Sequence, residues 1–212
     1  MKARFAALLV FAAIFMLAMP ASADTFLFNS GGTVSAGGAV ITFTNAAGTI
    51  VASGFNGSGG TKLLAQKSGG GDENGLGLAG LSDLEILAPN FIQLDISGLS
   101  KPATFQVALS SVQAGENFSI WISATADCFV SSCKISGAGA TGTGVAFDST
   151  VGHPIYITLS GFTGQRYIDI TSGNSGDVLI QQAAAVPEPG SIALLGTGLL
   201  GFAGAVRRKL SL

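Results

Sequence analysis

The residues of this 212-residue chain that could do chemistry are few, with two cysteines and one histidine among them. Four residues separate Cys128 from Cys133, whereas a redox-active pair usually has the tighter Cys-x-x-Cys spacing. Zinc takes about four ligands, and His153 is the only histidine that could add to the two thiols. With the export signals described below, the pair predicts a structural disulfide between Cys128 and Cys133.

Acidic residues gather in one glycine-rich stretch. Asp72 and Glu73 come directly before Asn74-Gly75, and Asp83 and Glu85 follow shortly after. Such carboxylates could supply ligands to a structural calcium ion, which takes roughly six to eight oxygens. The spacing does not match an EF-hand loop, and solvated turn acids are the alternative that we favour. The metal question stays open, and apart from this calcium hypothesis we expect no cofactor.

Trp121 is the single tryptophan, and it alternates with Ile120 and Ile122 in an apolar run. An exposed indole on a sheet could stack against a sugar ring, so Trp121 is the candidate residue for sugar stacking. The alternative is that a loop or the edge of a second sheet covers it, because large aromatic side chains are usually buried.

Catalytic signatures are weak. His153 precedes Pro154 at an expected turn, and the chain has neither a Gly-x-Ser-x-Gly elbow nor a Cys/His nucleophile signature. Phosphate loops, dinucleotide fingerprints and zinc motifs are also missing from the sequence. We therefore expect no enzyme, with a small secreted hydrolase as the least favoured reading.

The elements that must position these residues are strands. Short runs rich in β-branched and aromatic residues alternate with Gly, Ser and Asn from residue 25 to residue 182. Apolar residues at every second position mark one buried face per strand, for example Phe105, Val107 and Leu109. This pattern predicts an all-β domain, an antiparallel β-sandwich of jelly-roll type, with a closed barrel as the alternative. The Gly-, Ala- and Thr-rich stretch 136–144 predicts a loop.

The N-terminus has the pattern of a secretory signal peptide. Two basic residues precede an apolar run of 14 residues, and small residues follow at Ala21 and Ala23. We expect a signal-peptide helix in residues 1–23, with cleavage after Ala23; an uncleaved N-terminal anchor is the alternative.

The C-terminus combines an extended segment, an apolar span and a basic stop. Pro187-Glu188-Pro189 cannot lie inside a helix, the apolar residues 191–206 follow, and Arg207 and Arg208 begin the basic cluster 207–209. As a helix the span would be about 24 Å long, so it predicts a short single transmembrane helix whose flanking Arg and Lys side chains reach the headgroups.

This C-terminal arrangement resembles the PEP-CTERM sorting signal of bacterial exported proteins. The resemblance implies recognition by an exosortase, an integral-membrane cysteine protease, with cleavage near Pro187-Glu188-Pro189 and removal of the helix; a permanent single-span anchor is the alternative. The body more weakly resembles sandwich domains that carry such signals, through Gly75-Leu76-Gly77 and Asp83-Leu84-Glu85-Ile86. We thus divide the chain into a signal peptide at 1–23, a sandwich domain at 24–183 and a sorting signal at 184–212.

Charge narrows the choice of partners. The whole chain carries a net charge of −2, which argues against nucleic acid, and residues 24–186 have five basic and eleven acidic residues, which leave −6. We expect an exported, non-catalytic surface or extracellular-matrix protein, membrane-anchored as a precursor and associated with exopolysaccharide or biofilm. Its expected partners are the exosortase and the membrane transiently, and exopolysaccharide. The alternative is a secreted carbohydrate-binding module.

Overall fold

The computed structural model describes most of the residues between 25 and 186 and a few residues of the C-terminal segment. The described residues are 25–34, 37–69, 73–99, 104–113, 115–126, 134–143, 154–160, 162, 166–173, 176–186, 196, 198, 199, 201, 202 and 206. For residues 33, 34, 82, 134–143 and 186 only the backbone is described. The chain divides into one compact unit, Ala23–Val186, which holds every strand, and a second unit of Met1–Ser22 with Pro187–Leu212.

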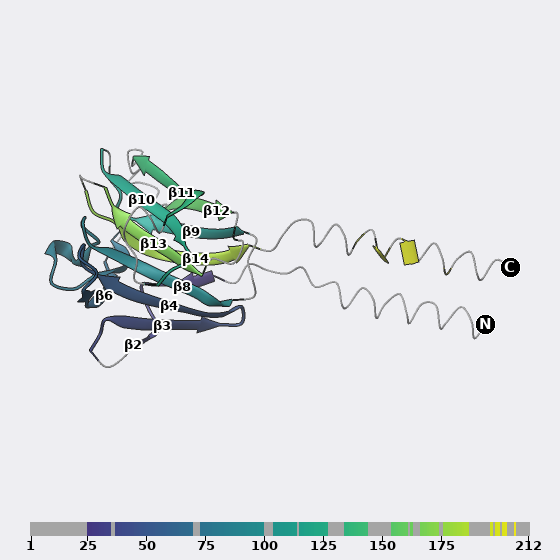
Figure 1. The fold of residues 1–212 in the computed structure, drawn as a ribbon. Coiled ribbons are helices and arrows are strands. Elements are labelled where there is room, and N and C mark those ends of the chain that lie inside the picture. Colours follow the sequence, from purple (N-terminus) through teal and green to yellow (C-terminus); the bar gives the residue numbers. More distant parts are fainter. Residues whose placement is uncertain are drawn as a thin grey trace. The chain divides into compact units, whose positions relative to one another are not determined.

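The first sheet has six antiparallel strands in the order β12-β9-β14-β7-β6, with β1 also paired to β14 (Figure 1). The last strand of the chain, β14, therefore lies in the interior of the sheet, between β9 and the pair β7 and β1. The bounds are β1 Thr25–Leu27, β6 Leu64–Ser68, β7 Asn74–Leu78, β9 Thr104–Ser110, β12 Ile155–Ser160 and β14 Leu179–Val186.

The second sheet has eight antiparallel strands in the order β11-β10-β13-β8-β4-β3-β2, with β5 paired to β4. A short 3-10 helix, η1 (Ser82–Leu84), precedes β8. The bounds are β2 Thr33–Val34, β3 Val40–Asn45, β4 Gly48–Phe55, β5 Thr61–Lys62, β8 Phe91–Leu99, β10 Asn117–Ser123, β11 Lys134–Thr143 and β13 Tyr167–Ser172.

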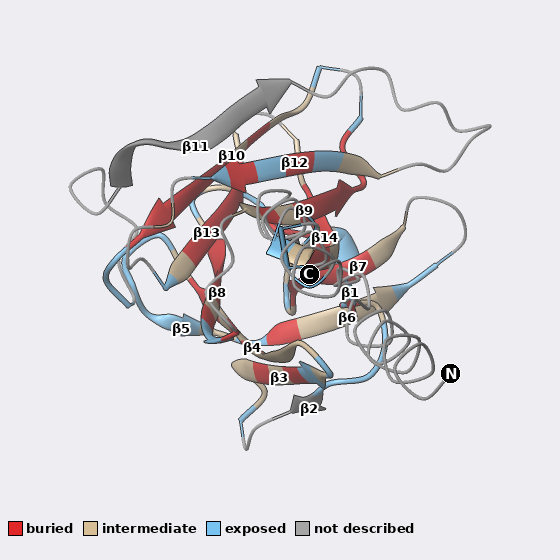
Figure 2. Cartoon of the chain, turned by 90° about the vertical axis from the view of Figure 1, so that its right-hand side faces the viewer, coloured by how far each residue is buried: buried red, intermediate tan, exposed pale blue. Residues whose placement is uncertain are grey.

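One hydrophobic core receives side chains from both sheets, and Figure 2 shows the buried residues on the strands of each. The alternation expected from the sequence is present: Phe105, Val107 and Leu109 of β9 are fully buried. Phe28, just after β1, meets Phe43 of β3 with ring centroids 4.7 Å apart, edge to face, which links the sheets. Buried aromatic and branched aliphatic side chains contribute the most apolar area, so these residues dominate the stability of the domain.

The predicted all-β fold with antiparallel sheets is confirmed, and the described strands form two separate sheets. The expectation of a loop at 136–144 is wrong, because β11 spans Lys134–Thr143 and pairs with β10. Small residues have little apolar side chain to bury, but their backbone can complete a hydrogen-bonded ladder at the edge of a sheet. The last strand also extends beyond the expected domain end at 183, to Val186.

The terminal segments are described only in part. Residues 1–24 and 187–195, which include the expected signal peptide, Ala21, Ala23 and Pro187-Glu188-Pro189, lie outside the described residues, as do Arg207 and Arg208. Gly196, Gly198 and Leu199 are among the six described residues of the C-terminal segment, and all six have helical backbone. Within the described part of the chain, no helix has both the length and the apolar character needed to span a bilayer.

Candidate functional site

A polar cluster lies at the end of the domain where β14 begins. It consists of Lys67, Glu73, Glu85 and Ser111, which we call the Glu85 cluster. Lys67 lies on β6, Glu73 directly precedes β7, Glu85 directly follows η1, and Ser111 directly follows β9. The paired strands β6 and β7 place Lys67 near Glu73, and the fold brings the more distant Glu85 and Ser111 to the same place.

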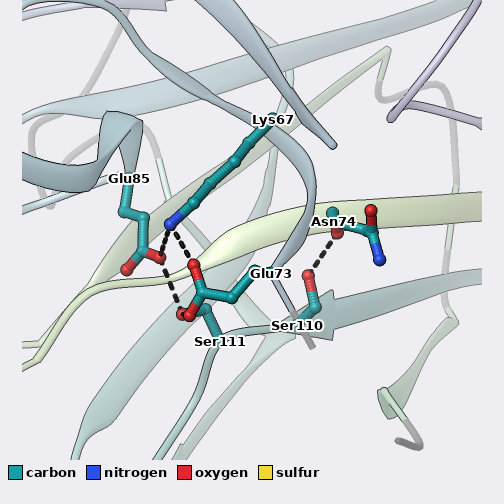
Figure 3. A network of polar contacts seen from close by, with 6 residues as sticks. All are labelled: Lys67, Glu73, Asn74, Glu85, Ser110 and Ser111. Atoms are coloured by element: carbon teal, nitrogen blue, oxygen red, sulfur yellow. Dashed lines mark hydrogen bonds and ion pairs between the residues drawn. The ribbon is translucent and has the colours of Figure 1, made fainter. Parts of the chain in front are cut away.

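Lys67 is at the centre of the contacts (Figure 3). Its Nζ lies 2.8 Å from Oε1 of Glu85 and also forms an ion pair with Oε2 of Glu73. The hydroxyl of Ser111 donates to the same Oε1 of Glu85 at 2.8 Å. Beside the cluster, the hydroxyl of Ser110 donates to the main-chain oxygen of Asn74 at 2.6 Å, which ties the end of β9 to the start of β7.

Glu85 is the buried member of the cluster. Its side chain is 4% exposed, whereas those of Lys67 and Glu73 are 19% and 35% exposed. Burial and, after it, a hydrogen bond to Asp177 raise the pKa of the Glu85 carboxyl to about 7, against the opposing contacts with Lys67 and Ser111. Glu85 thus changes charge near neutral pH, and the strength of its pairing with Lys67 changes with it.

The two partners of Lys67 have opposite electrostatics. The hydrogen bond from Lys67 holds the pKa of Glu73 below its ordinary value. Burial works to lower the pKa of Lys67, but hydrogen bonds to Glu73 and Glu85 outweigh it and raise that pKa. Glu116 and Asp177 form a second acidic pair nearby. Burial raises the pKa of Glu116, and the neighbouring Asp177 adds to this rise. This end of the domain is accordingly acidic, with Lys67 between two of its carboxylates.

Unusual backbone conformations hold the cluster in place. Asp83, Leu84 and Ser111 have positive φ values of 58°, 62° and 61°. Such values are uncommon outside glycine, above all for a large side chain such as leucine, and they persist only where surrounding contacts support them. Here the contacts are the bonds of Glu85 directly after Leu84, and the bond that Ser111 donates.

The glycines of the Gly75-Leu76-Gly77 segment explain how the η1 segment fits against β7. A Cβ at Gly77 would run into the main-chain oxygen of Leu84, and a Cβ at Gly75 would lie 2.7 Å from the main-chain oxygen of Ile180. Glycine is therefore required at both positions by close backbone approach. The two segments of the weaker resemblance, 75–77 and 83–86, are brought together around Gly77 and Leu84.

The four acidic residues of the calcium hypothesis do not lie together in one described site. Glu73 and Glu85 face the ammonium group of Lys67, Asp83 is exposed, and Asp72 lies outside the described residues. Among the residues that the structure describes, no three His, Cys, Asp or Glu side chains are arranged to hold a metal ion. In the described contacts, the ammonium group of Lys67 pairs with Glu73 and Glu85, as a bound metal ion would.

Sequence reasoning missed Lys67 and Ser111. Nothing in the local pattern distinguishes Lys67 from Lys62, because the contact of Lys67 with the buried Glu85 forms only in the folded domain. The acids Glu73 and Glu85 were found through their clustering in a glycine-rich stretch.

Trp121 is buried, with only 4% of its surface exposed. It lies across from Asp169 of β13, and the side-chain amide of Gln93 on β8 donates to Asp169 Oδ1 at 2.7 Å. Asp169 and Gln93 are buried as well. Sugar stacking requires an exposed indole, so the structure favours the alternative in which Trp121 is covered.

Cys128, Cys133 and His153 lie outside the described residues. The two cysteines fall in the segment between Ser123 and Lys134, whose backbones pair across β10 and β11. The disulfide therefore stays a prediction.

The C-terminal end of β14 is the second site of interest. Ala185 pairs with Phe105, and Val186 pairs with Thr104 at the start of β9. On the other side of β14, Thr25 of β1 pairs with Ala184. The sequence Pro187-Glu188-Pro189 follows Val186 directly, so the expected sorting signal, 184–212, begins within the last residues of β14.

A comparison with protein families gives a match to the segment that begins at the end of β14. Residues 185–209 match the PEP-CTERM protein-sorting motif. The chain carries this motif at its C-terminus. The match confirms the predicted sorting signal, and it implies export, a membrane-anchored precursor and processing by an exosortase. No curated protein and no solved structure matches the chain significantly.

Proposed function

We propose that the protein is a non-catalytic component of the cell surface or extracellular matrix, sorted and cleaved by an exosortase and associated with exopolysaccharide. The observation that carries the proposal is the sorting motif, which begins within the last strand of a folded all-β domain. In this account the signal peptide is removed after Ala23, the apolar span 191–206 anchors the precursor, and a jelly-roll-like sandwich is delivered to the surface.

The negative charge of the domain limits how it can associate with an anionic exopolysaccharide. Residues 24–186 carry a net charge of −6, which favours solubility and repels anionic polymers unless divalent cations bridge them. Pull-down of the processed protein with native exopolysaccharide is therefore expected to need calcium or magnesium and to fail in a chelator. Binding that a chelator leaves unchanged would contradict this bridging.

A carbohydrate-binding module is the alternative function. The residues that could support it are Trp121, Asp169 and Gln93, which lie side by side on neighbouring strands. An indole can stack on a sugar ring, and a carboxylate and an amide can bind its hydroxyl groups. All three are buried, so the surface or matrix role is the better supported proposal.

The sorting proposal is tested by replacing Pro187, Glu188 and Pro189 together with alanine in a host that has an exosortase. We expect the variant to stay in the membrane fraction with its C-terminus intact. The matched control replaces Leu210, Ser211 and Leu212, which lie beyond the matched residues, and should be processed normally. Normal processing of the first variant would overturn the proposal.

A further inference from the structure

The chain enters and leaves the domain on neighbouring strands. β1 lies beside β14 (Figure 2), with Thr25 opposite Ala184 and Phe26 opposite Ala183. Neighbouring strands are about 4.8 Å apart. Asp24 alone separates Thr25 from the expected cleavage point after Ala23, and Ala184 directly precedes the first matched residue of the sorting motif. Both processing points therefore adjoin the same end of the first sheet.

β1 is firmly attached to the domain. Phe26 is 3% exposed and Phe28 is fully buried. The main-chain nitrogen of Phe28 donates to the oxygen of Gln181 at 3.0 Å, and the side-chain amide of Gln66 donates to the oxygen of Phe28 at 3.1 Å. Separating β1 from β14 would therefore expose two phenylalanine side chains and break these bonds.

β14 is also needed by the rest of the sheet. It pairs with β9 from Leu179 to Val186, and Leu179 and Ile180 are fully buried. The first two residues of the sorting motif, Ala185 and Val186, belong to this pairing. A protease needs an extended, accessible segment, so residues held between β9 and β1 can be cut only after local opening.

We propose that the folded β1–β14 pair limits where and how fast the exosortase acts, so that the cut falls after Val186 and β14 stays whole in the released protein. Cleavage breaks one peptide bond beyond Val186: the acyl carbon bonds to water or to an acceptor amine, and the leaving amino group takes up a proton. This inference rests on the proposed exosortase sorting. It adds that folding of the domain regulates that step.

A spacer experiment tests the limit. A Gly-Ser spacer inserted between Val186 and Pro187 moves Pro187-Glu188-Pro189 away from the paired strands. We expect cleavage in the host to become at least about threefold faster, because the enzyme can then engage the residues before the cut without opening β14. The matched control places the same spacer in the exposed turn at Gly59, far from β14 in the chain, and should be cut at the wild-type rate. Equal rates for all three chains, or a wild-type product that ends before Val186, would overturn the inference.

A second measurement separates this inference from exosortase sorting itself. The detergent-solubilised full chain is treated with a broad-specificity protease, and the fragment that contains β14 is measured by mass. We expect this fragment to end at Val186 or beyond, whether or not an exosortase cuts the chain in cells. If it ends inside 179–185 the inference fails, even if sorting is correct. If the boundary is as expected but the motif is never cut in the host, the sorting proposal fails instead.

Discussion

The Nζ of Lys67 lies 2.8 Å from Oε1 of Glu85, a carboxylate whose side chain is 4% exposed. The contact joins β6 to the segment that follows η1, and the bond from Ser111 extends it to the end of β9. A buried carboxylate without its cation is costly, so this contact determines how the acidic end of the domain responds to mutation and to pH.

Replacing Lys67 with methionine should destabilise the domain. Near neutral and alkaline pH the variant leaves the Glu85 carboxylate buried among acids, and removing one partner of such a pair costs on the order of 3 kcal/mol. At about pH 5.5 Glu85 is protonated, and the loss should shrink to about 1 kcal/mol, the value of the more exposed Glu73 contact. Chemical denaturation at both pH values measures this difference. Lys62→Met is the matched control and should change stability by less than about 0.5 kcal/mol; an equal loss at both pH values would contradict the assignment.

Stability should fall as pH rises toward and through 7. The pKa of Glu85 is raised from 4.5 to about 7, so the folded state binds a proton that the unfolded state releases, and this contribution is present below 4.5 and lost as pH rises to 7. The pKa of Glu73 is lowered, so its contribution is lost as pH falls below its ordinary value. A maximum on the mildly acidic side is therefore expected in melting temperatures measured across pH. Glu85→Gln should reduce the fall on the neutral side without changing the acidic side, while Glu116, whose pKa is also raised, keeps its own part of the fall. A profile that this variant leaves unchanged would refute the role of Glu85.

Gly77→Ala should disrupt the cluster from a distance. The added Cβ meets the main-chain oxygen of Leu84, so the η1 segment must shift, at a cost of about 3 kcal/mol. The shift moves Glu85 away from Lys67, and the pH dependence near 7 should be lost as well. Gly80→Ala is the comparison: Gly80 has φ 76° and open space, so its variant costs about 1 kcal/mol of backbone strain and keeps the pH dependence. Identical pH profiles for the two variants would show that Gly77 does not position Glu85.

The fluorescence of Trp121 reports its burial directly, because it is the single tryptophan. At 4% exposure, emission should be blue-shifted and poorly quenched by acrylamide, and oligosaccharides should leave it unchanged. A red-shifted, freely quenched emission, with a change that saturates as polysaccharide is added, would support the sugar-stacking hypothesis.

The predicted disulfide is tested by mass. The exported protein should be lighter than its reduced form by two hydrogen atoms, and alkylation without reduction should label neither Cys128 nor Cys133. Replacing both with serine should cost about 2 kcal/mol, as expected for closing so short a loop. Labelling of both thiols in the exported protein would disprove the bond.

The strands with apolar alternation could be predicted from the sequence, because a strand with one buried face has an apolar residue at every second position. The segment Phe105, Val107 and Leu109 shows this, and all three are buried. β11 could not be predicted in the same way, since Gly, Ala and Thr show no alternation and its place depends on backbone pairing with β10.

The candidate sites divide along the same line. The sorting motif is local in sequence, so its residue types and order were sufficient to identify it. The Glu85 cluster is only partly local. Its acids stand out as a group in the sequence, but the contacts of Lys67 and Ser111 with Glu85 form only in the folded domain. The sequence did not predict that Pro187 directly follows a paired strand. The expected domain end was 183, whereas β14 continues to Val186.

The central claim is that the chain is exported, anchored and then cut at its sorting motif. Its most direct test is the intact mass of the protein recovered from the envelope and from the medium of its native host. We predict a product that begins at Asp24 and ends at Val186 or between it and the apolar span 191–206. A product that still ends at Leu212 in both fractions would mean a permanently tethered protein and would contradict the account.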